Sequence, residues 1–291
     1  MKIGIVCGRT SQGLTIIESI ARVMLYFGPA GYPEGSKGPI DALETVHRLG
    51  LNALEVQFVR QARMEERKAR SFGRRAEELG ILLSAHAPYY INFNSANRTT
   101  VNKSVEWILR TARIADHMGA WVIVFHAASY SGKSPRRATN AVIRGLQRCK
   151  ELMDEEGLDS KLGLETMGKK GTWGTLPEIG EVVKVVEGVI PVVDFGHIHA
   201  RSDGLFGSVA DFHEIIDEVE AIDDDHMHCH FSCIEYTDAG EKRHLPLAAK
   251  DPDFSFLAEV LVGIHRDATV ISETPLLEKD ALRMKSMVGS I

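Results

Sequence analysis

Residues 122–126 read VIVFH, a short apolar run that ends in a histidine. The same form recurs along the chain, and the intervals between the runs have helical periodicity. The runs are LLSAH (82–86), VIVFH (122–126), LGLE (162–165), PVVD (191–194), HMHCH (226–230) and TVISE (269–273). Short apolar runs that alternate with helices are typical of a parallel sheet with right-handed crossovers. The pattern therefore predicts an α/β protein.

The number of these units points to a barrel. We expect strands near residues 2–6, 53–58, 82–86, 121–126, 161–165, 190–194, 226–231 and 269–273. Helical patterns fill the intervals, for example at 62–79 and 134–157. An open doubly wound sheet is the competing arrangement, but no glycine-rich phosphate loop follows the first run. Because eight βα units close naturally into a barrel, we predict one (β/α)8 TIM barrel with eight parallel strands, formed by residues 1–291 as a single domain.

Residues 8–38 interrupt this pattern. They contain Pro29, Pro33, several glycines and an apolar stretch at 16–27. We interpret the segment as a long loop inserted after the first strand, and loops of such length are usually functional or disordered. On that interpretation it lies on the catalytic face and influences what the site accepts.

Composition limits the class of protein. The formal net charge is -6 and the sequence pI is about 6.1, whereas a general nucleic-acid binder is usually basic. Bound divalent cations would shift this balance, since each adds positive charge inside the site. The four cysteines have no disulfide-framework spacing, no apolar run reaches the roughly 18 residues that span a bilayer, and the first residues lack a signal-peptide pattern. We therefore expect a cytoplasmic protein with no membrane partner.

The strand ends carry the functional signal. The six runs end in residues that can bind a metal, namely His86, His126, Glu165, Asp194, His230 and Glu273. A single His or Asp at such a position is more often a structural residue or a helix cap. In a barrel, however, these six ends converge on one rim, where three buried carboxylates would repel one another without a cation. Mixed nitrogen and oxygen ligands without thiolate favour zinc or manganese.

Three more histidines extend the cluster. His197 follows Asp194 by three residues in DFGH, and His244 lies in GEKRHLPL, after the seventh predicted strand. His228 faces the same side as His230 by strand alternation. A role for His228 in the core or in support of the ligands is at least as plausible as a role in the site.

These residues resemble the endonuclease IV family of apurinic/apyrimidinic endonucleases, which are barrels of the xylose-isomerase-like group. The resemblance runs from about residue 50 to 290. Its motifs are HAPYYIN with His86 and Tyr89, VIVFH with His126, LGLET with Glu165, DFGH with Asp194 and His197, HCHFS with His230, and ISETP with Glu273. The family's Asp-x-His-x-x-Leu-Gly segment is matched less well by KRHLPLA. There Lys242 stands at the Asp position and Ala248 replaces the Gly, while Glu241, one residue away, is a candidate to substitute for the Asp.

The resemblance implies zinc, with manganese as an alternative. Glu165 would bridge two firmly bound ions. His86 and His126 would complete one of them, and Asp194, His230 and Glu273 would complete the other. The family's third zinc uses the His of Asp-x-x-His and the partly missing segment, so only His197 and His244 are matched. We therefore expect a weakened or absent third metal, with the Lys242 ammonium taking over part of its charge.

The implied activity is hydrolysis of double-stranded DNA on the 5′ side of abasic sites, as in base excision repair. Glu165 and Glu273 are then the expected catalytic carboxylates. Tyr89 and Tyr90 are candidates for wedging into the duplex, although packing at the barrel rim explains them equally well. Arg60 and Lys242 are further candidates for DNA contact. Loop cations that could meet phosphates are Arg98, Lys103, Lys133, Arg136, Arg137, Lys169 and Lys170. We expect the chain to act as a monomer.

Two other classes remain open. A sugar isomerase or epimerase of the same barrel group would hold one metal with Glu165, Asp194, His230 and Glu273, and its two glutamates would move a proton beside a carbonyl. Such an enzyme does not require His86 or the other additional histidines, which favours the nuclease, whereas the acidic pI favours the isomerase. The third class is a DNA- or metal-binding protein that has lost turnover.

Overall fold

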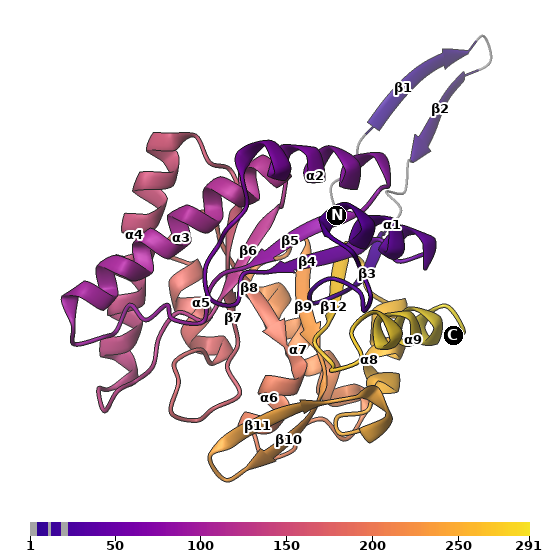
Figure 1. Ribbon diagram of the computed structural model, residues 1–291. Helices are drawn as coiled ribbons and strands as arrows, with labels where there is room; N and C mark the ends of the chain where they lie inside the picture. Colours follow the sequence, from indigo (N-terminus) through magenta and orange to yellow (C-terminus); the bar gives the residue numbers. More distant parts are fainter. Residues whose placement is uncertain (1–4, 11–12, 19–22) are drawn as a thin grey trace.

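The chain folds around a parallel sheet that closes almost completely into a barrel (Figure 1). The computed structural model describes residues 5–10, 13–18 and 23–291. Within them the barrel sheet has eight strands in the order β3-β12-β9-β8-β7-β6-β5-β4. The strands are β3 (Leu25–Pro29), β4 (Ala53–Gln57), β5 (Leu82–His86), β6 (Val122–Phe125), β7 (Lys161–Glu165), β8 (Val189–Asp194), β9 (Met227–Phe231) and β12 (Ala268–Ser272). The predicted (β/α)8 barrel is confirmed.

Helices cover the outside of the barrel (Figure 1). They are α1 (Pro39–Arg48), α2 (Glu66–Glu78), α3 (Arg98–Met118), α4 (Pro135–Glu156), α5 (Leu176–Val183), α6 (Phe195–Arg201), α7 (Val209–Ile222), α8 (Phe254–Val262) and α9 (Glu278–Val288). Two antiparallel hairpins lie outside the barrel sheet, β1 (Ile5–Thr10) with β2 (Gly13–Glu18) and β10 (Cys233–Thr237) with β11 (Gly240–Leu245). A short 3-10 helix, η1 (Leu247–Ala249), follows β11. Among the described residues, no helix combines the length and the apolar character needed to cross a bilayer.

The start of the barrel differs from the sequence-based prediction. The first barrel strand is β3, which falls inside the range 8–38 that we expected to be a loop. The expected strand at 2–6 lies largely outside the described residues, and the part that is described begins the β1–β2 hairpin. The main-chain N–H of Met24 binds Asp267, which directly precedes β12, so the chain enters β3 at the amino ends of the strands. The interpretation of an insertion on the catalytic face is therefore wrong. The segment that follows β3 is the shorter one at 30–38.

Asn52 joins the two strands at which the barrel closes. Its side-chain oxygen accepts a hydrogen bond from the main-chain N–H of Phe27 at 2.8 Å, and its amide nitrogen donates to the carbonyl of Leu25 at 3.0 Å. The strands approach so closely here that a Cβ on Gly28 would lie 1.9 Å from the carbonyl oxygen of Ala53. Glycine in β3 and asparagine before β4 are therefore the residues that let β3 meet β4.

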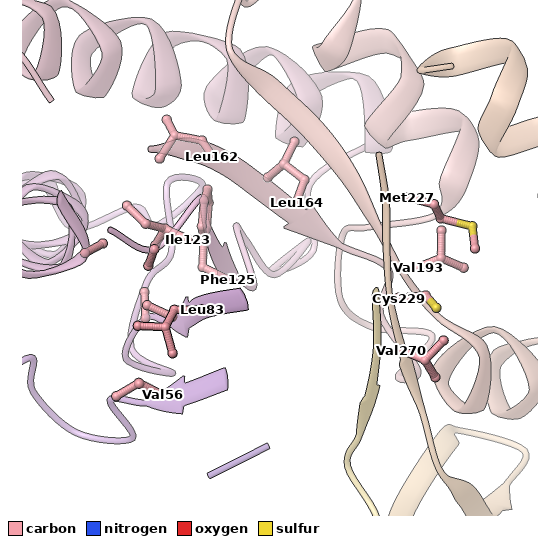
Figure 2. Packing of buried hydrophobic residues seen from close by; sticks show 14 of the residues in the cluster. Val56, Leu83, Ile123, Phe125, Leu162, Leu164, Val193, Met227, Cys229 and Val270 are labelled. Atoms are coloured by element: carbon pink, nitrogen blue, oxygen red, sulfur yellow. The ribbon is translucent and has the colours of Figure 1, made fainter. Parts of the chain in front are cut away.

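Alternation along the strands separates the apolar core from the barrel interior. The outward-facing residues pack against the helices in one large buried cluster (Figure 2). Those labelled in the figure are Val56, Leu83, Ile123, Phe125, Leu162, Leu164, Val193, Met227, Cys229 and Val270. The residues between them point inward. On one side they form a small apolar cluster, Val122, Val124, Ile190 and Val192. On the other side they are polar and buried, namely Glu55, Ser84, His228 and Thr269.

Candidate metal centre

Site A, formed by His86, His126 and Glu165, lies where β5, β6 and β7 end. The Nε2 atoms of the two histidines lie 3.1 and 2.7 Å from the same carboxylate oxygen, Oε2 of Glu165. The Nδ1–H of His86 donates to the carbonyl of Ala87 at 2.9 Å, so Nε2 is the nitrogen that faces the site. The described ligand atoms of this site all lie within 4.8 Å of one another.

Site B, formed by Glu165, Asp194, His230 and Glu273, lies beside site A at the ends of β7, β8, β9 and β12. Asp194 is also the N-cap of α6, because its Oδ1 accepts the main-chain N–H of His197 at 2.6 Å. Its other oxygen, Oδ2, is buried without a hydrogen-bond partner in the described part of the chain. Such an atom is costly unless it binds something, and a cation held by site B would bind it.

Glu165 connects the two sites. Its Oε2 faces the histidines of site A, while its Oε1 lies 3.3 Å from Nδ1 of His230. Burial alone would raise the pKa of this carboxyl, but the surrounding histidines, His126 foremost, hold the pKa well below its usual range. Glu165 is therefore an ionised carboxylate with one oxygen available to each site, which is the arrangement of a bridging ligand.

Site C, formed by His197, Glu241 and His244, adds a third group. The Nε2 atoms of the two histidines lie 3.3 Å apart. The Nδ1 of His197 lies 2.9 Å from the carbonyl of Thr166, and the Nδ1 of His244 lies 3.0 Å from the carbonyl of Glu273. Since carbonyls only accept, both Nδ1 atoms carry a hydrogen, and both Nε2 atoms face site C with the Glu241 carboxylate beside them.

A β-bulge explains how Glu241 enters site C. In the β10–β11 hairpin, Tyr236 pairs with Glu241 while Glu235 pairs with Arg243, so Lys242 is an extra residue on β11. Residues three apart on a regular strand face opposite sides, but the extra residue brings Glu241 and His244 to the same side. Gly168 makes room, because a Cβ there would lie 2.7 Å from Cβ of Glu241.

The structure corrects the role expected for Lys242. Its ammonium forms an ion pair with Glu235 and its side chain is 56% exposed, so it lies outside site C. Glu241 supplies the negative charge of site C that the replacement of Asp by Lys at position 242 would otherwise remove. The prediction that Lys242 takes over the charge of a third cation is therefore wrong, and Lys242 gives no reason to expect a weakened third site.

The donor sets fit divalent cations. Sites A, B and C each combine imidazole nitrogens with carboxylate oxygens, which is the ligand chemistry of zinc and manganese. Burial opposes protonation of His86 and His197, yet Glu165 and Asp194, the strongest carboxylate neighbour of each ring, raise both pKa values to about 9. Protons thus occupy positions that a metal would take, and binding a metal would release them.

The expected DNA-contacting residues are distributed around this rim. Tyr89 lies beside site A, with its ring 5.5 Å from that of His86 and 5.9 Å from that of His126, and half of its surface is exposed. Tyr90 is equally exposed but packs against Trp107, at a ring separation of 5.8 Å. Arg60 is exposed on the loop between β4 and α2. Of these three residues, the structure brings Tyr89 to the metal-ligand groups.

Glu55 belongs to the same region, and the sequence analysis missed it. It is completely buried on the inner face of β4, and its Oε2 lies 3.1 Å from Nε2 of His228 and 3.2 Å from Nε2 of His230. Burial would raise the pKa of Glu55, but His230 and His228 hold it far below the usual range. The available signal was a single acidic residue inside the apolar run ALEV (53–56).

A groove rich in arginine runs along the flank of the barrel next to this rim. Arg98 at the start of α3 lines it together with Arg137, Arg144 and Arg148 on one face of α4. No Asp or Glu of the described residues lines the groove, and of these four arginines only Arg148 forms a salt bridge there, with Glu151 at 3.1 Å. In a chain with a net charge of -6 this is a local concentration of positive charge.

Comparison with known proteins places the chain among barrels of one family. Residues 43–286 match the family model described as xylose isomerase-like TIM barrel. An uncharacterized protein of Methanocaldococcus jannaschii is 34% identical over 266 residues, which cover 89% of this chain and 95% of that protein. A probable endonuclease 4 of Pediococcus pentosaceus is 30% identical over 146 residues, about half of each chain (47% and 48%).

Solved structures agree on the fold and differ in activity. A D-tagatose 3-epimerase-like protein superposes with a TM-score of 0.68 at 20% identity, covering 86% of this chain and 91% of that one. Endonuclease IV from Thermus thermophilus gives a TM-score of 0.68 at 16% identity, covering 93% and 100%. At such identities the likeness shows the barrel alone, and function has to be argued from the site.

Proposed function

The chain belongs to the xylose isomerase-like TIM barrel family, and from that premise we propose that it is a metal-dependent phosphodiesterase that cleaves DNA on the 5′ side of abasic sites. The observation that carries the proposal is the convergence of sites A, B and C on one rim. The rings of His126 in site A and His197 in site C have centroids 6.1 Å apart, and Glu165 belongs to both A and B.

Three adjoining cation sites suit a phosphate better than a sugar. Divalent ions held there would activate water near neutral pH and neutralise charge on a phosphodiester. Glu165 would hold two of them through its two oxygens, while Glu241, His197 and His244 would hold the third. A carbonyl isomerase needs one metal and two proton-transferring groups. That reaction would therefore not use the additional ligands of sites A and C.

Glu273 is the residue best suited to accept a proton. Burial raises its pKa, which the positive charge of His230 opposes and the negative charge of Glu165 reinforces. Its Oε1 lies 3.4 Å from Nδ1 of His230, and its Oε2 lies 3.7 Å from Nδ1 of His244. Glu273 therefore stands between sites B and C, where it can take a proton from water that attacks the phosphorus.

The surface around the site is compatible with a duplex. Tyr89 and Tyr90 are exposed at the rim, where an aromatic side chain can fill the space left by a missing base. Arg137 and Arg144 lie seven residues apart on α4, about 10 Å along the helix, and can neutralise backbone phosphates next to the site. We propose that the protein binds DNA as a monomer, with its phosphate contacts on this flank.

A sugar epimerase is the second candidate. The structural likeness to a D-tagatose 3-epimerase-like protein supports this candidate. Site B alone has the two glutamates and the ligands for one metal ion that such a reaction requires. The additional ligands of sites A and C argue against it.

A cleavage assay separates the candidates. The substrate is a duplex oligonucleotide with one abasic analogue, tested with zinc or manganese, and Glu165→Gln is the inactive variant. Glu181→Gln, the same change at an exposed position of α5, is the matched control. We expect cleavage on the 5′ side of the lesion by the wild type and the control only. Absence of cleavage with metal demonstrably bound would reject the nuclease, and ketose substrates would then test the epimerase.

A further inference from the structure

The barrel interior contains a carboxylate that sites A, B and C do not use as a ligand. Glu55 lies on the inner face of β4, fully buried, and its Oε2 accepts hydrogen bonds from Nε2 of His230 at 3.2 Å and Nε2 of His228 at 3.1 Å. The hydroxyl of Ser84 donates to the same oxygen at 2.9 Å, and the amide of Gln57 donates to Oε1 at 2.9 Å. Burying a carboxylate costs free energy unless hydrogen bonds compensate for the lost water. The four hydrogen-bond donors around Glu55 therefore indicate that this buried carboxylate has a specific role.

His230 connects this carboxylate to site B. Its Nδ1 lies 3.3 Å from Oε1 of Glu165 and 3.4 Å from Oε1 of Glu273, while its Nε2 faces Glu55. A neutral imidazole carries one hydrogen, and the partner of one nitrogen decides which nitrogen has the lone pair. Carboxylates face both nitrogens of His230 and cannot donate, so a cation in site B would displace the Nδ1 hydrogen while Glu55 retains the hydrogen on Nε2.

We propose that Glu55 is a positioning residue of the metal centre, which fixes the orientation and the tautomer of His230 so that Nδ1 is presented to the cation in site B. The inference rests on the proposed function in so far as site B holds a metal. Carboxylates that accept a hydrogen bond from a metal-binding histidine orient the ring and strengthen it as a ligand. Glu55 contributes this through His230, because it is not among the site B ligands; with His228 and His230 it forms a separate group of possible ligand atoms.

His228 and Ser84 hold Glu55 in place. His228 is fully buried, donates through Nε2, and has no partner for Nδ1 among the described residues. Glu55 is therefore its side-chain hydrogen-bond partner among the described residues, and its ring lies 5.5 Å from that of His230. Three hydrogen bonds to a single oxygen keep the carboxylate from rotating away from His230. Removing Ser84 takes away one of these bonds but leaves the carboxylate next to His230, so it should weaken metal binding less than loss of the carboxylate does.

The test measures metal binding without turnover. Purified metal-free chains are titrated with zinc against a chromophoric chelator, and the absorption spectrum of the cobalt-loaded chain reports the ligand environment. For Glu55→Gln we expect zinc affinity at one site to fall by roughly 10- to 100-fold and the cobalt spectrum to change. Glu55→Asp keeps the charge but withdraws it from His230 by about one carbon–carbon bond, so we expect a similar loss. Ser84→Ala is expected to bind zinc more tightly than Glu55→Gln does. The control Glu181→Gln, the same change at an exposed position of α5, is expected to bind zinc within about threefold of the wild type.

The possible outcomes distinguish a positioning role of Glu55 from a direct ligand role and from failure of the proposed function. If Glu55→Gln and Glu55→Asp bind zinc as the wild type does, Glu55 does not position His230, while the proposed function is unaffected. Loss of one whole ion with unchanged affinity for the others would make Glu55 a direct ligand and overturn the positioning role. A wild-type chain that binds no zinc or cobalt would reject the proposed function and this inference together. Should Glu55→Gln not fold, Glu55→Asp provides the same comparison.

Discussion

The Nε2 atoms of His197 and His244 face each other at 3.3 Å, and each ring has already given its Nδ1 hydrogen to a main-chain carbonyl. Two lone pairs at this distance would repel, so either a hydrogen on one Nε2 or a cation has to lie between them. With the Glu241 carboxylate beside them, the pair forms a candidate third metal site.

Removal of Glu241 is expected to remove that site. In Glu241→Ala, two imidazoles remain without their acidic partner, so we expect the metal content after mild chelation to fall by about one ion per chain. Metal analysis by plasma mass spectrometry measures it. Lys242→Ala, which changes the neighbouring residue outside the site, is the control and should retain the wild-type content. Equal content in both variants would contradict a ligand role for Glu241.

Metal affinity should rise with pH. The carboxylates around His86 and His197 raise their pKa values to about 9 against burial, so both rings are protonated at pH 7 in the metal-free chain and must lose protons to bind a cation. We expect zinc affinity to increase between pH 6.5 and 9, as measured by chelator competition at fixed ionic strength. A flat profile over this range would show that the rings are already neutral.

The raised pKa values of His86 and His197 also affect stability. As pH rises, metal affinity should increase while the metal-free fold becomes less stable. A histidine whose pKa is about 9 in the folded chain and 6.5 in the unfolded chain stabilises the fold fully below pH 6.5 and no longer does so above pH 9. The metal-free chain should therefore lose thermal stability as pH rises through this window. The zinc-loaded chain should not lose it there. Melting curves with and without chelator at several pH values provide the comparison, and parallel curves would exclude the linkage.

Charge reversal on α4 tests the flank groove. Arg137→Glu with Arg144→Glu should weaken binding to an undamaged duplex and lower the slope of log affinity against log salt by about two, or about one per lost phosphate contact. Fluorescence anisotropy measures both. Lys161→Glu with Lys184→Glu, at the amino end of β7 and just after α5, makes the same change in net charge at the opposite end of the barrel and should have little effect. Equal losses in the two double variants would mean that total charge, rather than this groove, governs binding.

Asn52→Ala tests the closure of the barrel. It removes the acceptor for the N–H of Phe27 and the donor for the carbonyl of Leu25, so we expect the free energy of unfolding to fall by about 1–3 kcal/mol. Urea denaturation monitored by circular dichroism measures it. Asn140→Ala, on the exposed side of α4, should change stability by less than about 0.5 kcal/mol.

The sequence predicted the residues at the strand ends because the signal is local. An apolar run followed at once by His, Asp or Glu, as in VIVFH, identifies both the strand and the residue that it presents, and six such residues are brought together in sites A and B. The first strand was misassigned because the runs at 5–10 and at 25–29 are both β-like, and local pattern cannot tell a hairpin from a barrel strand. The contact that decides is between Asn52 and Leu25.

Other parts of the site depend on distant contacts that no local pattern contains. Glu241 was considered one residue out of place, and only the bulge at Lys242 shows that it faces His244. Glu55 was missed because its partner His228 lies 173 positions further along the chain. A lone acidic residue in an apolar run was the available signal, and the structure adds that this residue is fully buried against His228 and His230.

The β10–β11 hairpin stands outside the barrel sheet and carries two of the three ligands of site C. The ligand group of site C can therefore be changed by altering the hairpin, without any change in a barrel strand. One extra residue at the bulge brings Glu241 to the side of His244, so the register of a surface hairpin determines which acid enters the site. Removing that residue would turn Glu241 away from His244 and leave sites A and B untouched.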